Sequence, residues 1–230
     1  PPYTELEPET LPEHEGHVSG VPGTRANISL ETNKPIERAS VVFATGDTIA
    51  LSIGSNRVSG TFSLTRSTEY TLRLVDEYGY ENRNPITYAI HVIPDEHPTV
   101  RIVNPSPVYD LGSDMRVTLE AEAVDDFGFD RMEIEYRGPD DRRRRDRLPI
   151  SRFGPGHARS FHSWDVGELD LLPEDRVTYR VIAWDNDRVS GPKRGESEEY
   201  VLRFPSAAEI FAETLAEQNT QISQINDVRQ

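Results

Sequence analysis

Apolar and polar residues alternate in short runs along most of this chain. In residues 25–31, RANISLE, every second residue is apolar, which places Ala26, Ile28 and Leu30 on one face of an extended strand. Similar runs recur at short, regular spacing, separated by Gly, Asn, Asp or Pro. They cover residues 38–44, 47–53, 57–64, 69–75, 86–92, 99–103, 115–124, 129–137, 159–166, 176–184 and 198–204. This spacing is typical of an all-β sandwich or barrel.

The runs form two sets that align with each other. Residues 23–43 align with 112–136, and residues 69–92 align with 176–204. In the second alignment each segment has a strand, a loop that begins with an Asp, and a final strand. The predicted fold class is therefore all-β, with two tandem Ig-like or fibronectin-like β-sandwiches followed by a C-terminal α-helix.

The expected domain boundaries follow the turn residues and the prolines. Residues 1–23 are rich in Pro, Glu and Gly and form a leader or an edge segment of the first module. The first sandwich covers 24–94, the linker 95–98, the second sandwich 99–204, and the C-terminal helix 205–230.

The hydrophobic period changes after Phe204. Ser206 and Glu209 have the spacing of a helix N-terminal capping box. The residues that follow at spacings of four and three are Phe211, Leu215, Gln218, Ile222 and Ile225. This seam predicts the start of a coiled coil that continues downstream, through which the chain self-associates or binds another protein. The alternative is a single helix that docks on the second sandwich.

Composition narrows the possible functions. The chain has 230 residues and a net charge of −15, so it favours cations and repels nucleic acid and anionic lipid. It has no cysteine, which excludes disulfides and thiolate metal sites. No run of 18 apolar residues occurs, so this fragment is not expected to contact a membrane itself. The first residues are Pro-Pro, and we expect the chain to be part of a longer protein.

Acidic residues gather in the predicted loops at one end of the second module. The B–C loop (125–130) and the F–G loop (185–197) of a sandwich emerge at the same end, where the linker also arrives. Hard oxygen ligands from several loops are what Ca²⁺ binds. The candidate ligands are Asp95, Glu96, Asp125, Asp126, Asp185 and Asp187. The alternative is that these side chains only form turns, because Asp and Asn bond readily to nearby backbone N–H groups.

One basic cluster interrupts the acidic chain. Residues 137–150, RGPDDRRRRDRLPI, contain a run of arginines that could bind an acidic partner. The run comprises Arg142, Arg143, Arg144 and Arg145. Aspartates dilute its charge, and GPDD is typical of a hairpin tip, so a solvated hairpin is the alternative.

The two tryptophans and the absence of catalytic motifs bear on the type of protein. Trp164 and Trp184 fall on predicted strands, where they either pack in the core or, if exposed, bind sugar. The chain has no G-x-S-x-G, H-E-x-x-H, P-loop or G-x-G-x-x-G motif. We therefore predict that it is not an enzyme and uses no cofactor apart from the candidate Ca²⁺.

Three segments resemble a family of large bacterial envelope proteins of unknown function. They are residues 179–213 (YRVIAWDNDRVSGPKRGESEEYVLRFPSAAEIFAE), 125–136 (DDFGFDRMEIEY) and 1–12 (PPYTELEPETLP). In that family, transmembrane helices precede Ig-like modules and long coiled coils follow. The resemblance implies a membrane-tethered protein with this fragment on the extracytoplasmic or periplasmic side.

Three functional hypotheses remain open. The first is a non-catalytic spacer or interaction arm of a larger membrane-anchored protein. The second is a module that binds envelope glycan or peptide, which exposed aromatic residues would favour. The third is an accessory domain of an enzyme whose catalytic part lies outside this fragment.

Overall fold

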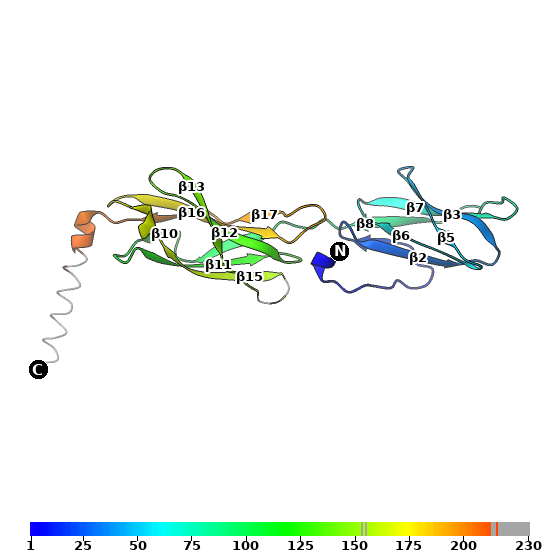
Figure 1. The fold of residues 1–230 in the computed structure, drawn as a ribbon, viewed down its shortest axis with the longest axis horizontal. Coiled ribbons are helices and arrows are strands. Elements are labelled where there is room, and N and C mark those ends of the chain that lie inside the picture. The colour runs from blue at the N-terminus through cyan, green and yellow to red at the C-terminus, as the bar shows by residue number, and fades with distance from the viewer. Residues whose placement is uncertain (153, 155, 213–214, 216–230) are drawn as a thin grey trace, which may run out of the picture. The chain divides into compact units, whose positions relative to one another are not determined.

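The computed structural model describes residues 1–152, 154, 156–212 and 215, and it divides into two compact units. The first unit comprises Pro1–Glu96 together with Asp187–Gly191, and the second comprises His97–Asn186 and Pro192–Gln230. The regular elements of each unit are β-strands, apart from short helices (Figure 1).

The first unit is a sandwich of two sheets. Its five-stranded sheet has the order β1 (Val18–Gly20), β8 (Thr87–Val92), β7 (Thr68–Asp76), β3 (Ile36–Phe43) and β4 (Thr48–Ala50). Its three-stranded sheet has the order β2 (Arg25–Glu31), β6 (Arg57–Ser63) and β5 (Ser52–Ile53). Both sheets contribute to one core, in which Val41 of β3 and Val58 of β6 are almost fully buried. A short 3-10 helix, η1 (Pro2–Thr4), lies ahead of the strands.

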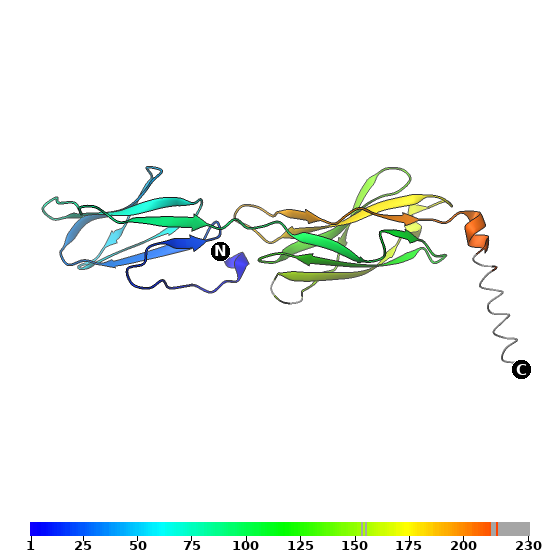
Figure 2. The same cartoon turned by 180° about the vertical axis from the view of Figure 1, so that it is seen from behind.

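The second unit is a larger sandwich, seen from behind in Figure 2. One sheet has the order β10 (Val108–Asp110), β18 (Tyr200–Arg203), β16 (Arg176–Asp185), β12 (Phe129–Arg137) and β13 (Arg143–Leu148). The short strand β17 (Arg194–Glu196) also pairs with β16. The other sheet has the order β14 (Ser151–Arg152), β15 (His157–Asp165), β11 (Arg116–Val124) and β9 (Thr99–Asn104). The 3-10 helix η2 (Gly167–Leu169) follows β15.

The alternation of apolar and polar residues in the sequence matches the alternation of buried and exposed side chains along the strands. Along β11, the side chains of Val117, Leu119, Ala121 and Ala123 are buried, and none of the residues between them is. Because successive side chains of a strand point to opposite faces, this period places one apolar face against the core. The predicted fold class, β-sandwiches of the Ig or fibronectin type with a helix at the C-terminus, is confirmed.

The two units share one strand order. In each, a short strand pairs in parallel with the last strand of its sheet: β1 with β8, and β10 with β18. In each, a central antiparallel pair follows, β7 with β3 and β16 with β12. They differ at one edge. In the second unit β9 pairs with β11, whereas β2, which has the place of β11 in the first unit, ends its sheet.

The structure adds the short strands β1, β10, β14 and β17, which the sequence did not predict, and it differs from the predicted strands in two further places. Residues 47–53 form two short strands, β4 and β5, which belong to different sheets. Leu51 between them is buried, so the chain crosses from one sheet to the other at a core residue. The arginine-rich run contains a strand, β13, that its sequence did not predict, because it has no apolar alternation.

The predicted capping box is present at the start of the C-terminal helix. Ser206 N donates to Glu209 Oε2 (2.8 Å), and Glu209 N donates to Ser206 Oγ (3.2 Å). Helix is described at residues 207–212 and at 215. The seam residues Gln218, Ile222 and Ile225 lie outside the described residues.

Candidate functional site

The loop after β7 begins at a buried carboxylate. Asp76 Oδ1 accepts the backbone N–H groups of Tyr78 (3.0 Å) and Tyr80 (2.9 Å), which shapes the turn. Its Oδ2 accepts a hydrogen bond from the Lys34 ammonium. The Lys34 hydrogen bond is the main reason why the pKa of Asp76 lies below its ordinary value.

The corresponding carboxylate of the second unit, Asp185 at the end of β16, also binds a backbone N–H and a lysine. It is 1% exposed. Its Oδ1 accepts the backbone N–H of Lys193 (2.9 Å), and its Oδ2 lies 3.1 Å from Lys193 Nζ. Lys34 and Lys193 are the only lysines in the chain, and both pair with this Asp. They come from different loops, since Lys34 precedes β3 and Lys193 follows β16, so the ion pair recurs although its sequence position does not.

Two more of the candidate calcium ligands form turns. Asp125 Oδ2 accepts the N–H groups of Phe127 (3.0 Å) and Gly128 (2.7 Å). Asp187 Oδ1 accepts those of Val189 (2.7 Å) and Ser190 (3.1 Å). This is the geometry that the turn alternative requires.

Burial raises the pKa of Asp125 above its ordinary value. The nearby carboxylates of Asp126 and Asp185 raise it further. These three carboxylates of the second unit therefore lie close enough to repel one another.

The six candidate calcium ligands are divided between the two units. Asp95, Glu96 and Asp187 belong to the first unit, and the other three belong to the second. The Tyr3 hydroxyl donates to Asp95 Oδ2 (3.2 Å) within the first unit. Over residues 1–152, 154, 156–212 and 215, no three His, Cys, Asp or Glu side chains are grouped so that they could hold a metal ion. The calcium site stays a prediction.

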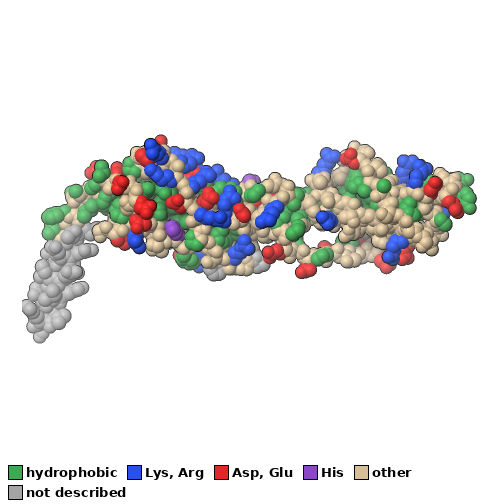
Figure 3. All heavy atoms as spheres, viewed as in Figure 1, with side chains coloured by type: hydrophobic (Ala, Val, Ile, Leu, Met, Phe, Trp, Pro, Cys, Tyr) green, Lys and Arg blue, Asp and Glu red, His purple; other side chains and the backbone are tan. Residues whose placement is uncertain are grey.

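The arginine cluster is engaged in ion pairs with neighbouring carboxylates. Arg144 binds Asp140 through two nitrogens, at 2.9 and 2.6 Å. Arg145 binds Glu135 Oε2 through Nε (2.8 Å) and a terminal nitrogen (2.6 Å). Figure 3 shows basic and acidic side chains side by side over this hairpin. The ion pairs neutralise part of the arginine charge, as the solvated-hairpin alternative expects. Docking of an acidic partner stays a prediction.

Glu135 is the centre of this network. It is 3% exposed, and Arg180 of β16 binds its second oxygen, Oε1, at 3.0 and 2.7 Å. Burial alone would raise the pKa of this carboxyl, but Arg180 and Arg145 outweigh that effect and lower it to about 2. Glu135 was not among the site residues predicted from the sequence. The available signal was a Glu in a predicted strand with an arginine-rich run close to it in the sequence.

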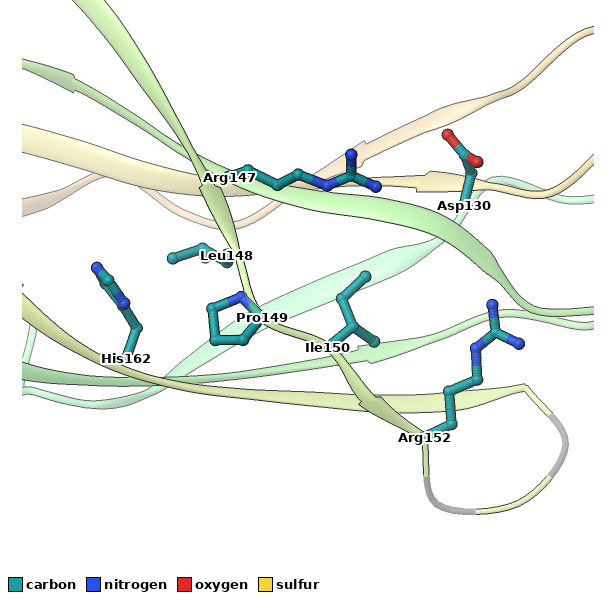
Figure 4. Close-up of a pocket in the computed structure, with 7 residues that line it drawn as sticks. All are labelled: Asp130, Arg147, Leu148, Pro149, Ile150, Arg152 and His162. Carbon is teal, nitrogen blue, oxygen red and sulfur yellow. The ribbon is translucent and has the colours of Figure 1, made fainter.

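A shallow depression lies where the chain passes from β13 to β14. Its volume is about 630 Å³. Figure 4 shows the side chains of Pro149 and Ile150 between those of Arg147 and Arg152. Its other lining residues are Asp130, Leu148 and His162. The Arg152 guanidinium donates to the Phe129 carbonyl (2.9 Å), so one of its two arginines supports the fold.

Both tryptophans are buried, and Trp164 belongs to the core cluster of the second unit, whereas Trp184 does not. Trp164 is 4% exposed and contacts the rings of Tyr136 and Tyr179 at centroid distances of 5.0 and 5.4 Å. Trp184 is 9% exposed, and the Arg131 guanidinium lies 4.1 Å from its ring centroid. Neither forms an exposed platform for a sugar ring.

Exposed aromatic residues occur instead on the loop between β7 and β8. Tyr78 is 77% exposed, Tyr80 is 71% exposed and Ile86 is 66% exposed. The Asp76 carboxylate holds the backbone N–H groups of both tyrosines. These residues are visible in the sequence, but the Asp, Asn and Gly residues around them predicted only a turn.

Among the described seam residues of the C-terminal helix, Phe211 and Leu215 are exposed, at 67% and 44%. Arg203 of β18 connects the helix start to the sandwich, since it binds Glu209 (3.1 Å) and Asp110 (2.6 Å). The start of the helix is therefore attached to the sandwich through polar contacts, while the side chains of Phe211 and Leu215 are exposed to water.

Comparisons with known proteins found likenesses among solved structures only. No family model matches the chain, and no curated protein matches it. Among solved structures, fibronectin(III)-like modules of CbhA from Clostridium thermocellum are 16% identical, with 86% of this chain and 95% of that chain covered and a TM-score of 0.31. A 1.5-MDa bacterial ice-binding adhesin is 9% identical, with coverages of 80% and 59% and a TM-score of 0.42. BcpA, the major pilin subunit of Bacillus cereus, is 9% identical, with coverages of 79% and 69% and a TM-score of 0.31.

These likenesses carry no argument about function, and the assignment to β-sandwiches rests on the strand order given above. Within the described part of the chain, no helix has the length and apolar character needed to cross a membrane.

Proposed function

We propose that this chain is a non-catalytic, extracytoplasmic spacer and interaction arm of a larger membrane-anchored bacterial protein. Two units of one strand order, each with its own core, suit a spacer. Buried charged groups such as Glu135 and Asp185 are bound to Arg or Lys of the same unit, which is a structural use of charge. The family resemblance of the sequence supports the envelope location.

The observation that carries the proposal is the exposed seam of the C-terminal helix. Phe211 and Leu215 are four residues apart, so they lie on one helical face, and both are exposed. The capping box fixes where this helix begins. An apolar helical stripe that does not face its own domain is suited to pack against a second helix. The expected partner is a protein helix, either of a second copy of the chain or of another chain.

The first prediction tests this helix by sedimentation equilibrium of the whole chain. We expect concentration-dependent self-association that weakens at least about tenfold in the double variant Phe211→Ser/Leu215→Ser, because two apolar side chains leave the seam. Ala212→Ser, which changes an exposed helical residue beside the seam, is the matched control.

A self-association that is unchanged in the double variant would contradict the proposal for the helix. A chain that is monomeric up to about 1 mM, the range of weak binding, would leave only a heterologous partner for the seam.

The second candidate function is binding of envelope glycan or peptide at the β7–β8 loop. The exposed side chains of Tyr78, Tyr80 and Ile86 favour it, since Tyr contributes large contact area at low entropic cost. The burial of Trp164 and Trp184 counts against a sugar site on a sheet face.

The test of this second candidate is a titration with soluble peptidoglycan fragments, followed by NMR on the natural protein and on Tyr78→Ser/Tyr80→Ser. Shifts that are lost in the variant would support binding at this loop.

A further inference from the structure

One edge of the first unit is open where its counterpart in the second unit is covered. In the second unit β9 pairs along β11. In the first unit β2 has the place of β11, but among the described residues no strand pairs with its outer edge. An open edge presents a row of backbone N–H and C=O groups that another strand can bind.

The leader does not supply the missing strand. Residues 1–17 precede β1 as β9 precedes β10, but they contain Pro8 and Pro12, which cannot donate to a ladder. The side chains of residues 5–10 are all exposed. Within the described residues, the hydrogen bonds of residues 5–15 join leader residues to one another, as in Glu15 N to Pro12 O (3.1 Å).

Hydrogen bonds at the two ends of β2 show which of its residues face the open edge. Leu64 N donates to Thr24 O (2.8 Å), and Thr32 N donates to Asn56 O (3.0 Å). Both bonds have the register of the β2–β6 pair, so the even-numbered residues direct their backbone groups towards β6. The backbone groups of Arg25, Asn27, Ser29 and Glu31 therefore point to the open edge.

The sequence of this edge is complementary to itself. In an antiparallel pair of two β2 strands centred on Ile28, Arg25 stands opposite Glu31 of the other copy, and Asn27 stands opposite Ser29. Each of these oppositions joins two residues whose backbone groups face the edge, so the hydrogen-bond pattern fits as well as the charges. Ala26, Ile28 and Leu30 then continue one apolar face across the junction.

We propose that β2 of one copy pairs antiparallel with β2 of a second copy and joins their two three-stranded sheets into one. The features that normally keep edge strands apart are absent from residues 25–31, which contain no proline and no inward-facing charge, and the β2–β6 register shows no bulge. A seven-residue edge gives a small interface, so this contact is weak and reversible. It is separate from the helix contact proposed above, and gives the arm a second point of self-association.

Cysteine cross-linking tests the pairing directly, since the natural chain has no cysteine. In Ile28→Cys, the two new thiols face each other across the two-fold axis at a non-hydrogen-bonded pair, where Cα atoms lie about 4.5 Å apart and a disulfide can form. We expect Ile28→Cys to give a disulfide-linked dimer at least about tenfold faster than Thr61→Cys, whose exposed residue lies on the inner strand β6. Ser29→Cys, which stands opposite residue 27, should react more slowly than Ile28→Cys.

Charge reversal provides the second measurement. Arg25→Glu places like charges opposite each other at both ends of the strand pair, and should weaken the dimer about tenfold. Arg25→Glu/Glu31→Arg restores the opposition and should recover the dimer. Thermal melting verifies that each variant folds. The same charge reversals are also made in the whole chain that carries Phe211→Ser/Leu215→Ser, which removes the helix contact. The β2 contact and the helix contact are then tested separately.

Three outcomes would overturn the proposal. One is cross-linking of Ile28→Cys no faster than Thr61→Cys at 1 mM protein, a concentration at which roughly millimolar contacts are populated. Another is a dimer in the helix variant that Arg25→Glu leaves unchanged. The third is protection of the Asn27 and Ser29 amides from exchange that does not depend on concentration, because then the leader covers the edge.

Discussion

At the scale of single residues, the charged groups inside the sandwiches support the fold. Glu135 sits on the outward face of β12, yet it is almost fully buried because arginines of β13 and β16 close over it. A buried carboxylate is costly to desolvate unless its oxygens are bound, and here both are. Removing the charge of Glu135 should therefore lower the free energy of unfolding, even though this side chain is near the surface.

The prediction for this network is a loss of stability in Glu135→Gln. Arg145 and Arg180 lose their shared anion, and urea unfolding should show a decrease of about 2 kcal/mol in the free energy of unfolding. Asp140→Asn is the control, since Asp140 and Arg144 form an exposed pair and its removal should leave the unfolding midpoint nearly unchanged. Equal effects of the two variants would contradict the role of burial.

The same residue sets a pH dependence. The pKa of Glu135 is about 2 in the folded protein and about 4.5 when unfolded, so its contribution is complete above about pH 5 and is lost as the pH falls towards 2. The difference in stability between the natural chain and Glu135→Gln should shrink below pH 4.5. A difference that stays constant from pH 7 to about 2.5 would exclude Glu135 as its source.

A third residue-scale prediction concerns close packing at Gly195 of β17. A Cβ at this position would overlap the Pro98 carbonyl oxygen, and this neighbour is backbone that cannot rotate away. Gly195→Ala should therefore lower the free energy of unfolding by about 1–3 kcal/mol. At Gly54 the nearest atom to such a Cβ lies 3.4 Å away, so Gly54→Ala is the control and should change stability little.

At the scale of elements, the longer strands could be predicted because their burial follows the period of two. Residues 129–137 were predicted as a strand and form β12, and residues 176–184 fall within β16. The strands β1, β10 and β17 have three residues each, too few to display a period. In β13 only Leu148 is buried and the rest is held by charge, so a hydrophobic pattern could not reveal it.

The candidate site was less predictable than the fold. The sequence places an Asp at the start of the loop after residue 75 and of the loop 185–197, and the structure shows that Asp76 and Asp185 each accept a backbone N–H from the loop that follows. The sequence alone does not reveal that Lys34 and Lys193 reach these carboxylates from different loops, because such contacts depend on tertiary packing. The sequence likewise could not show that Phe211 and Leu215 are exposed, because their exposure depends on where the folded sandwich lies.

At the scale of the whole molecule, the net charge of −15 makes cation binding the property to measure. If the acidic loops bind Ca²⁺, a concentration of one hundred times Kd should stabilise the chain by about 2.7 kcal/mol and raise Tm by a few degrees. Thermal melting in EDTA and in millimolar Ca²⁺ measures this, with Mg²⁺ as the ion control. Asp126→Asn should abolish the rise of Tm in Ca²⁺ and leave the Tm in EDTA unchanged. Equal melting in EDTA and Ca²⁺ would leave these residues as turn formers.

The parallel strand pairs of the two units have a mechanical consequence. A chain under tension pulls β1 from its N-terminal end and β8 from its C-terminal end, and because the strands run parallel, these forces act in opposite directions along the ladder. All three paired positions, Val18 with Ile90 through Gly20 with Val92, are then loaded together in shear and cannot open one after another. The pairing of β10 with β18 repeats this geometry. Since forced unfolding is governed by the unfolding rate, each unit should resist stretching more strongly than its equilibrium stability indicates.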